Sequence, residues 1–99
     1  MLDIAKKIED GCAYFTLEGR LDTVTSSELE NELKDVLYDV DEVVFDLENL
    51  DYISSAGLRV LLSTQKNIGE EGSMKVVNVN DTIMEIFDVT GFTDILDIE

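Results

Sequence analysis

The sequence predicts a single α/β domain spanning residues 1–99, with a mixed, mostly parallel sheet and helices mainly on one face. Three observations lead to this fold class. An Asp10-Gly11 hairpin signal separates two segments in which apolar and polar residues alternate, a pattern typical of antiparallel strands. Segments of helical period then alternate with short β-prone segments, which implies parallel strands joined by right-handed crossovers. With 44% apolar residues, the chain can also fill a core.

The first two strands are expected at Leu2–Ile8 and Cys12–Glu18. Lys6 interrupts the inward-facing set of the first strand, which favours a position at the edge of the sheet. The single cysteine, Cys12, cannot form an internal disulfide and is expected to be a small core or strand residue. The apolar residues that share a face are Leu2, Ile4 and Ile8 in the first strand, and Ala13, Phe15 and Leu17 in the second.

A loop at residues 19–24 is expected to lead into the first helix. Thr25 and Glu28 match a capping box, although Thr23 or Ser26 could also cap this helix. The helix should bury a stripe of apolar residues at helical spacing, whose members are Leu29, Leu33, Val36, Leu37 and Val40.

The stretch from Val43 to Leu62 organises the fold. Val43–Leu47 is β-prone and almost continuously apolar, as is typical of a strand covered on both faces. Residues 48–53 are expected to turn the chain back into a helix that begins at Ser54-Ser55, where a hydroxyl can cap free backbone N–H groups. Gly57 would allow this helix to approach a strand or partner closely. The residues expected on one helix surface are Leu58, Leu61, Leu62, Gln65 and Ile68, with Gly69 and Gly72 at its end.

The remaining chain predicts a strand at Met74–Val79, a short helix, and a final short strand or apolar tail at Phe92–Ile98. Asn80 or Asp81 can cap the short helix, and Gly91 should end it. Its packing residues are expected to be Ile83, Ile86 and Phe87, and those of the tail Ile95 and Ile98. The predicted order is therefore strand, strand, helix, strand, helix, strand, helix, strand.

Composition narrows the function classes. The 23 acidic and 7 basic residues leave a net charge of −16, which repels nucleic acid and anionic membrane surfaces and favours a basic protein partner. No apolar run approaches the roughly 20 residues that span a bilayer, and Met1–Lys7 does not resemble a signal peptide, so a cytoplasmic location is expected. With no histidine and one cysteine, no metal site, cofactor or catalytic Cys-His pair is expected.

The polar residues that follow parallel strands should lie at one edge of the sheet. Asp22-Thr23 and Asp51–Ser55 each follow an expected strand, and the carboxyl ends of parallel strands share an edge. A phosphoryl group on Ser55 would be favoured by the positive end of the helix dipole. It would also be opposed by acidic neighbours, namely Asp46, Glu48 and Asp51.

Four segments carry a family resemblance, namely Gly19–Asp22, Val43–Leu47, Tyr52–Leu58 and Ile86–Phe92. In this order they resemble a STAS domain of the bacterial anti-sigma factor antagonist type, and the similarity covers nearly the whole chain. The resemblance implies a non-enzymatic domain that binds an anti-sigma factor with serine kinase activity and so frees a sigma factor. Phosphorylation of one serine ends this binding, and a serine phosphatase restores it.

Carried over by position, the phosphoacceptor of the family falls on Ser55. The family commonly has an aspartate before this serine and a Ser or Thr after it, where this chain has Ser54 and Ala56. Ser54 is therefore an alternative acceptor. The residues that the resemblance assigns to partner binding are Asp22, Thr23, Asp51, Ser54, Ser55, Ala56, Gly57 and Arg59.

Two other functions remain open on the sequence. STAS domains also act as non-phosphorylated adaptors in transporters or signalling complexes. Alternatively, Asp46, Glu48 and Asp51 could supply oxygen ligands to Mg²⁺ at an acidic phosphoacceptor site. The absence of histidine, of a nucleophilic triad and of a glycine-rich phosphate loop disfavours this second alternative.

Overall fold

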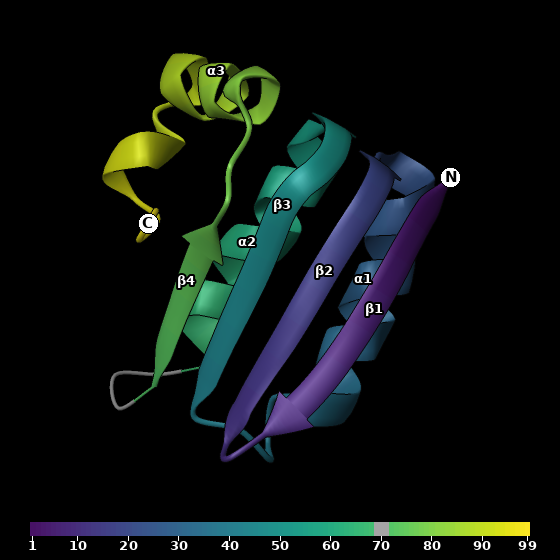
Figure 1. The fold of residues 1–99 in the computed structure, drawn as a ribbon, viewed down its shortest axis with the longest axis vertical. Coiled ribbons are helices and arrows are strands. Elements are labelled where there is room, and N and C mark those ends of the chain that lie inside the picture. Colours follow the sequence, from purple (N-terminus) through teal and green to yellow (C-terminus); the bar gives the residue numbers. More distant parts are fainter. Residues whose placement is uncertain (69–71) are drawn as a thin grey trace.

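The computed structural model describes residues 1–68 and 72–99, which form one four-stranded sheet with most of its helical residues on one face (Figure 1). Helices α1 (Thr23–Val36) and α2 (Ser55–Asn67) lie behind the sheet in this view, and α3 (Asp81–Thr90) lies beyond one end of it. The strands are β1 (Leu2–Glu9), β2 (Cys12–Leu21), β3 (Glu42–Ile53) and β4 (Ser73–Val77). Helix α3 is followed by a short 3-10 helix, η1 (Phe92–Asp94).

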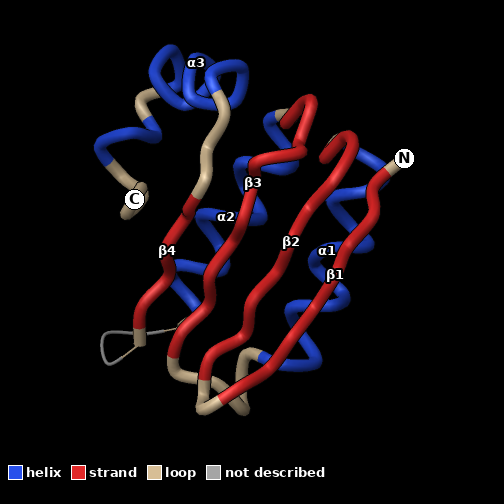
Figure 2. The backbone as a smooth tube through the Cα atoms, in the orientation of Figure 1, coloured by secondary structure: helices blue, strands red, loops and turns tan. Residues whose placement is uncertain are grey.

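The sheet has the strand order β1-β2-β3-β4, which can be followed along the trace in Figure 2. The pair β1–β2 is antiparallel, and the pairs β2–β3 and β3–β4 are parallel. Asp10 and Gly11 both have positive φ angles, +50° and +78°, as a tight hairpin turn requires. The predicted α/β class, the hairpin and the edge position of the first strand are therefore confirmed.

The prediction that residues 48–53 form a turn is wrong, because β3 continues to Ile53. Two register shifts in the pairing of β2 with β3, between Thr16 and Glu18 and between Gly19 and Arg20, each give β3 one extra residue. These bulges change the spacing of buried residues along β3 from every second to every third position, as at Leu47, Leu50 and Ile53. The alternation that would have identified a strand is lost as a result.

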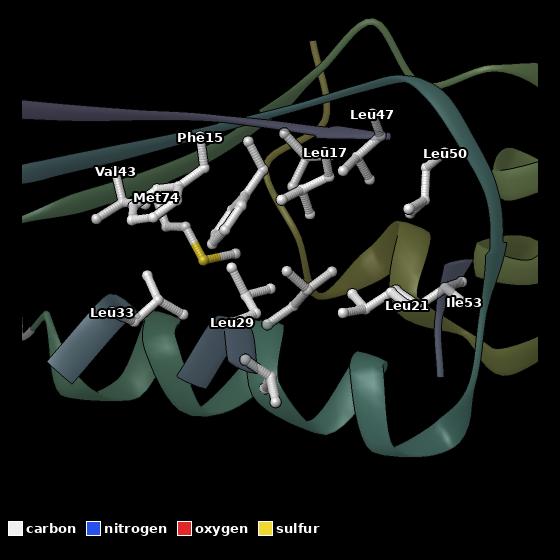
Figure 3. Packing of buried hydrophobic residues seen from close by; sticks show 14 of the residues in the cluster. Phe15, Leu17, Leu21, Leu29, Leu33, Val43, Leu47, Leu50, Ile53 and Met74 are labelled. Carbon is white, nitrogen blue, oxygen red and sulfur yellow. The ribbon is translucent and has the colours of Figure 1, made fainter. Parts of the chain in front are cut away.

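The core lies between the sheet and α1 and α2, where the side chains of both layers meet (Figure 3). Phe15 and Phe45 stack at its centre with 5.6 Å between ring centroids. Val44 is only half-buried, because it points to the sheet face that α1 and α2 leave open. The expectation of a strand covered on both faces is therefore wrong. The fully buried large residues are Phe15, Phe45, Phe87, Leu17, Leu21, Leu29, Leu47, Leu50, Leu61, Ile83, Val43 and Val76.

Several boundaries in the first half differ from the predictions. Residues 19–21 extend β2 and Thr23 already begins α1, so only Asp22 remains of the predicted loop. Ile8 is 50% exposed, although it was expected to share the inward-facing side of β1 with the buried Leu2. Cys12 is buried in β2, as expected. The stripe of α1 packs in or against the core, although Val40 lies beyond the end of the helix.

In the second half, β4 ends at Val77, so Asn78 and Val79 of the predicted strand lie outside it, and Asn78 has a positive φ angle of +53°. Asn80 caps α3, and Gly91 ends it in the left-handed conformation. Of the two predicted outcomes for the last segment, the strand does not form: the chain forms η1 and then a single parallel bridge between Val76 and Ile98. Ile98 packs against the core, as predicted for an apolar tail. The predicted packing of Ile95 is wrong, because Ile95 is 43% exposed and Leu96 is the buried residue of this segment. The predicted helix end at Gly69 lies outside the described residues.

Candidate partner-binding site at the start of the second helix

The two serines at the start of α2 have different roles. Ser54 is the N-cap, with an extended backbone and a side-chain oxygen that accepts the N–H of Gly57 at 3.2 Å. The N–H of Ser54 donates to the carbonyl of Leu21 at 2.9 Å, which fixes the start of α2 against the end of β2. Ser55 is exposed, and none of the side-chain hydrogen bonds in residues 1–68 and 72–99 involves its hydroxyl. The hydroxyl of Ser55 is therefore available at the surface.

Gly57 holds the first turn of α2 against the sheet. A Cβ atom at this position would lie 2.8 Å from Cγ of Leu21 and 2.9 Å from Cγ1 of Ile53. Both neighbours are fully or almost fully buried. The prediction that Gly57 permits close approach of the helix to a strand is confirmed, and the close approach positions Ser55 at the edge of the sheet.

Asp22 caps α1 beside this turn. Its carboxylate accepts the backbone N–H groups of Val24 and Thr25, each at 3.0 Å. The hydroxyl of Thr25 accepts the N–H of Asp22 at 2.8 Å, which completes a reciprocal capping box. The hydrogen bond from the Thr25 backbone is the main reason that the pKa of Asp22 lies below its ordinary value. The predicted caps at Thr23, Thr25 or Ser26 are therefore wrong, and Thr25 is instead the second partner of the box.

A groove runs between the N-terminal halves of α1 and α2, and we call it the α1–α2 groove. It brings together Thr23, Ala56 and Arg59, three of the residues expected to bind a partner. The start of α2 beside the groove contains three more of them, Ser54, Ser55 and Gly57. Asp51 is an exposed residue near the end of β3 and does not line the groove. The complete lining is Thr23, Ser26, Ser27, Glu30, Ala56, Arg59, Val60 and Ser63.

Val60 and Ser63 of the groove were not among the residues predicted to bind a partner. Val60 and Ser63 follow Ala56 by four and seven residues, a spacing that places all three on one face of α2. That spacing was visible in the sequence, but the partner face of α2 could not be identified without the position of α1. Whether the groove and the turn beside it contact a partner stays a prediction.

Asn80 has a second role besides the helix cap that the sequence indicated. Its side-chain oxygen caps α3 by accepting the N–H of Ile83 at 2.9 Å. Its side-chain nitrogen also donates to the carbonyls of Leu47, Glu48 and Leu50, at 3.1, 3.1 and 2.8 Å. Asn80 therefore ties α3 to the irregular part of β3 that leads to Ser54.

Asp46, one of the acidic residues considered as an Mg²⁺ ligand, is engaged in hydrogen bonds. The carboxylate of Asp46 accepts hydrogen bonds from the N–H of Glu48 at 3.1 Å and from the side chain of Asn78 at 3.0 Å. Asp46 also lies on the open face of the sheet, beside Val44 and Lys75. Within residues 1–68 and 72–99, no three Asp, Glu, Cys or His side chains are placed to hold a metal ion.

The family model described as the STAS domain matches residues 3–99. The chain belongs to the STAS domain family. BtrV of Bordetella bronchiseptica, named as a candidate anti-sigma factor antagonist, is 37% identical over 89 residues, which cover 87% of this chain and 76% of BtrV. The anti-sigma-B factor antagonist of Bacillus subtilis is 29% identical over 98 residues, covering 98% of this chain and 90% of that protein.

The fold of this STAS domain is also found in solved structures. An anti-sigma factor antagonist from Mycobacterium paratuberculosis matches with a TM-score of 0.89 and 24% identity, covering 99% of this chain and 85% of that one. In the described part of the STAS domain, no helix has the length and apolar character to cross a membrane. The fold and family expected from the sequence are therefore both confirmed.

Proposed function

We propose that this STAS domain is a cytoplasmic anti-sigma factor antagonist, which acts by binding and not by catalysis. In this proposal, the bare protein captures an anti-sigma factor that is also a serine kinase, and the capture frees a sigma factor. Phosphorylation of Ser55 ends the capture, and a serine phosphatase restores it. The names of two relatives support only the antagonism of an anti-sigma factor; the kinase, the phosphatase and the phosphorylation of Ser55 extend to this chain what the family resemblance implies.

The observation that carries the proposal is the exposed Ser55 hydroxyl beside the α1–α2 groove. A kinase needs an accessible hydroxyl, and a switch needs that hydroxyl to lie within the contact surface. Val24 lies next to Thr23 on the first turn of α1, where it is 75% exposed and offers the proposed partner an apolar contact. The expected partner surface therefore combines a small apolar element with the polar residues around Ser55, as the mixed composition of transient interfaces requires.

The hydroxyl of Ser55 is a better acceptor than that of Ser54. Ser54 is half-buried and its oxygen is engaged by Gly57, so a phosphoryl group there would disturb the cap of α2. In the proposed transfer, the Ser55 oxygen forms a bond to the γ-phosphorus of ATP, the bond to the bridging β–γ oxygen breaks, and ADP leaves. The hydroxyl proton passes to a base of the kinase. Hydrolysis by the phosphatase returns the hydroxyl and releases inorganic phosphate.

The physical effect of the switch is local. A phosphoryl group adds about −1.5 to −2 charges, and a charge placed within an interface costs binding through repulsion and desolvation. The first turn of a helix tolerates a negative group, because the helix dipole and the free N–H groups favour it. The fold should therefore survive phosphorylation while the complex does not.

The test is a titration of Ser55→Ala and Ser55→Asp against the cognate anti-sigma kinase. We expect Ser55→Ala to bind as the bare protein does, and Ser55→Asp to bind at least about tenfold more weakly, equivalent to about 1.4 kcal/mol. Asn31→Asp is the matched control, because Asn31 is exposed on α1 and does not line the groove. This control adds one negative charge and should leave the affinity unchanged. Equal affinities for the two Ser55 variants would refute the proposal.

A further inference from the structure

Arg59 lies one helical turn after Ser55 on α2, at the i+4 position. Side chains four residues apart on a helix are neighbours, and a negative group preceding a cation at this spacing has the favourable orientation. Arg59 is exposed and lines the α1–α2 groove. A phosphoryl group on the hydroxyl of Ser55 therefore lies within reach of this guanidinium group.

The other basic side chains are engaged or distant. Four of the seven form ion pairs, and Arg20 instead stacks on the ring of Tyr52 at 4.4 Å. Among the described residues, Arg59 and Lys66 form no ion pair. Lys66 lies eleven residues after Ser55 on the same helix, which corresponds to a rise of about 16 Å. The four paired residues are Lys6, Lys7, Lys34 and Lys75.

We propose that Arg59 binds the phosphoryl group of phosphorylated Ser55 within the same molecule. This inference rests on the proposed function and gives its switch a second component. In the bare protein, the Arg59 guanidinium is available to an acidic group of the partner that docks on the α1–α2 groove. In the phosphorylated protein, the phosphoryl oxygens occupy its planar donor fork, which suits phosphate geometry. Phosphorylation thus removes an attractive contact from the partner in addition to introducing a repulsive one.

The experiment uses the full chain with phosphoserine installed at position 55 during translation, and ³¹P NMR to follow the second ionisation of the phosphoryl group with pH. An adjacent cation stabilises the doubly charged form of the phosphoryl group. The apparent pKa of this second ionisation should therefore be lower in the phosphorylated protein with Arg59 than in the phosphorylated Arg59→Gln variant. We expect the two pKa values to differ by about 0.15–0.4, as for a favourable i,i+4 charge pair. The difference should shrink in 1 M salt.

Lys66→Gln is the matched control, because it removes the same charge from the same helix at a distance from Ser55. We expect its phosphoryl pKa to equal that of the unchanged protein. Equal pKa values with and without Arg59, or an equal shift from the loss of Lys66, would overturn the inference. The measurement needs no partner protein, so its failure is distinct from that of the proposed function, which is decided by the affinities of the Ser55 variants.

Discussion

Replacing Gly57 with alanine tests how tightly the start of α2 is held against the sheet. The added Cβ would lie 2.8 Å from Cγ of Leu21, 3.0 Å from its Cδ2 and 2.9 Å from Cγ1 of Ile53. Neither Cγ of Leu21 nor Cγ1 of Ile53 is the free end of a flexible side chain, and both residues are buried in the core. The first turn of α2 must therefore move outward, and Ser54 and Ser55 must move with it.

Two opposing effects set the size of the change. Overpacking of a well-packed core costs about 1–3 kcal/mol, whereas the replacement of glycine by alanine in a helix gains up to about 1 kcal/mol. We expect Gly57→Ala to lower the free energy of unfolding by about 1 kcal/mol. In urea unfolding at 25 °C, this corresponds to a fall in the midpoint of about 0.5–1 M with an unchanged slope.

Leu21→Ala provides the matched background for this experiment. It removes the Cγ and Cδ2 atoms that the new Cβ would meet, so Gly57→Ala should cost less in the Leu21→Ala protein than in the unchanged one. An unfolding midpoint of Gly57→Ala at or above that of the unchanged protein would refute the reasoning. An identical cost in both backgrounds would show that the crowding lies elsewhere.

Two further predictions concern the residues that fix the helix starts. Asn80→Ala should lower the free energy of unfolding by about 2 kcal/mol in urea, because it removes a cap and the bonds to three carbonyls of β3. Asn80→Ser keeps a capping oxygen but loses the bonds to β3, so it should cost less; equal costs would contradict the capping role, and no cost for Asn80→Ser would contradict the bridging role. The backbone hydrogen bonds from Thr25 and Val24 depress the pKa of Asp22, so its carboxylate stabilises the fold above about pH 4 and loses this effect as the pH falls through the folded-state pKa. The difference in unfolding free energy between the unchanged protein and Asp22→Asn should therefore be constant from pH 6 to 8 and change only on acidification below about pH 4. A change near neutral pH would show that another titrating group causes the difference.

The sequence predicted those parts of the fold whose patterns are local. The hairpin at Asp10-Gly11, the buried stripe of α1 and the stop at Gly91 each depend on residues a few positions apart. The end of β3 could not be predicted in this way, because its bulges arise from pairing with β2, a strand thirty residues earlier. Leu50 and Ile53 therefore resembled isolated apolar residues in an acidic turn.

The candidate site was predictable in its components and not in its assembly. Four of the five residues from Asp22 to Ser26 have side chains that can cap a helix, and only the hydrogen bonds identify Asp22 and Thr25 as the capping pair. The second role of Asn80 also depends on three carbonyls about thirty residues earlier, which no spacing in the sequence brings to it. Residue types thus indicated possible interactions, whereas the tertiary fold selected among them.

The segment after η1 has a consequence for self-association. The N–H of Val76 donates to the carbonyl of Asp97, and its carbonyl accepts the N–H of Glu99, both at 2.9 Å. Lys75 adds an ion pair to Glu99 at 3.5 Å. Unpaired strand edges are the usual templates for the addition of a foreign strand. A second molecule that approached β4 would have to displace these bonds first, so fibrillar growth through this side of the sheet carries an inherent barrier.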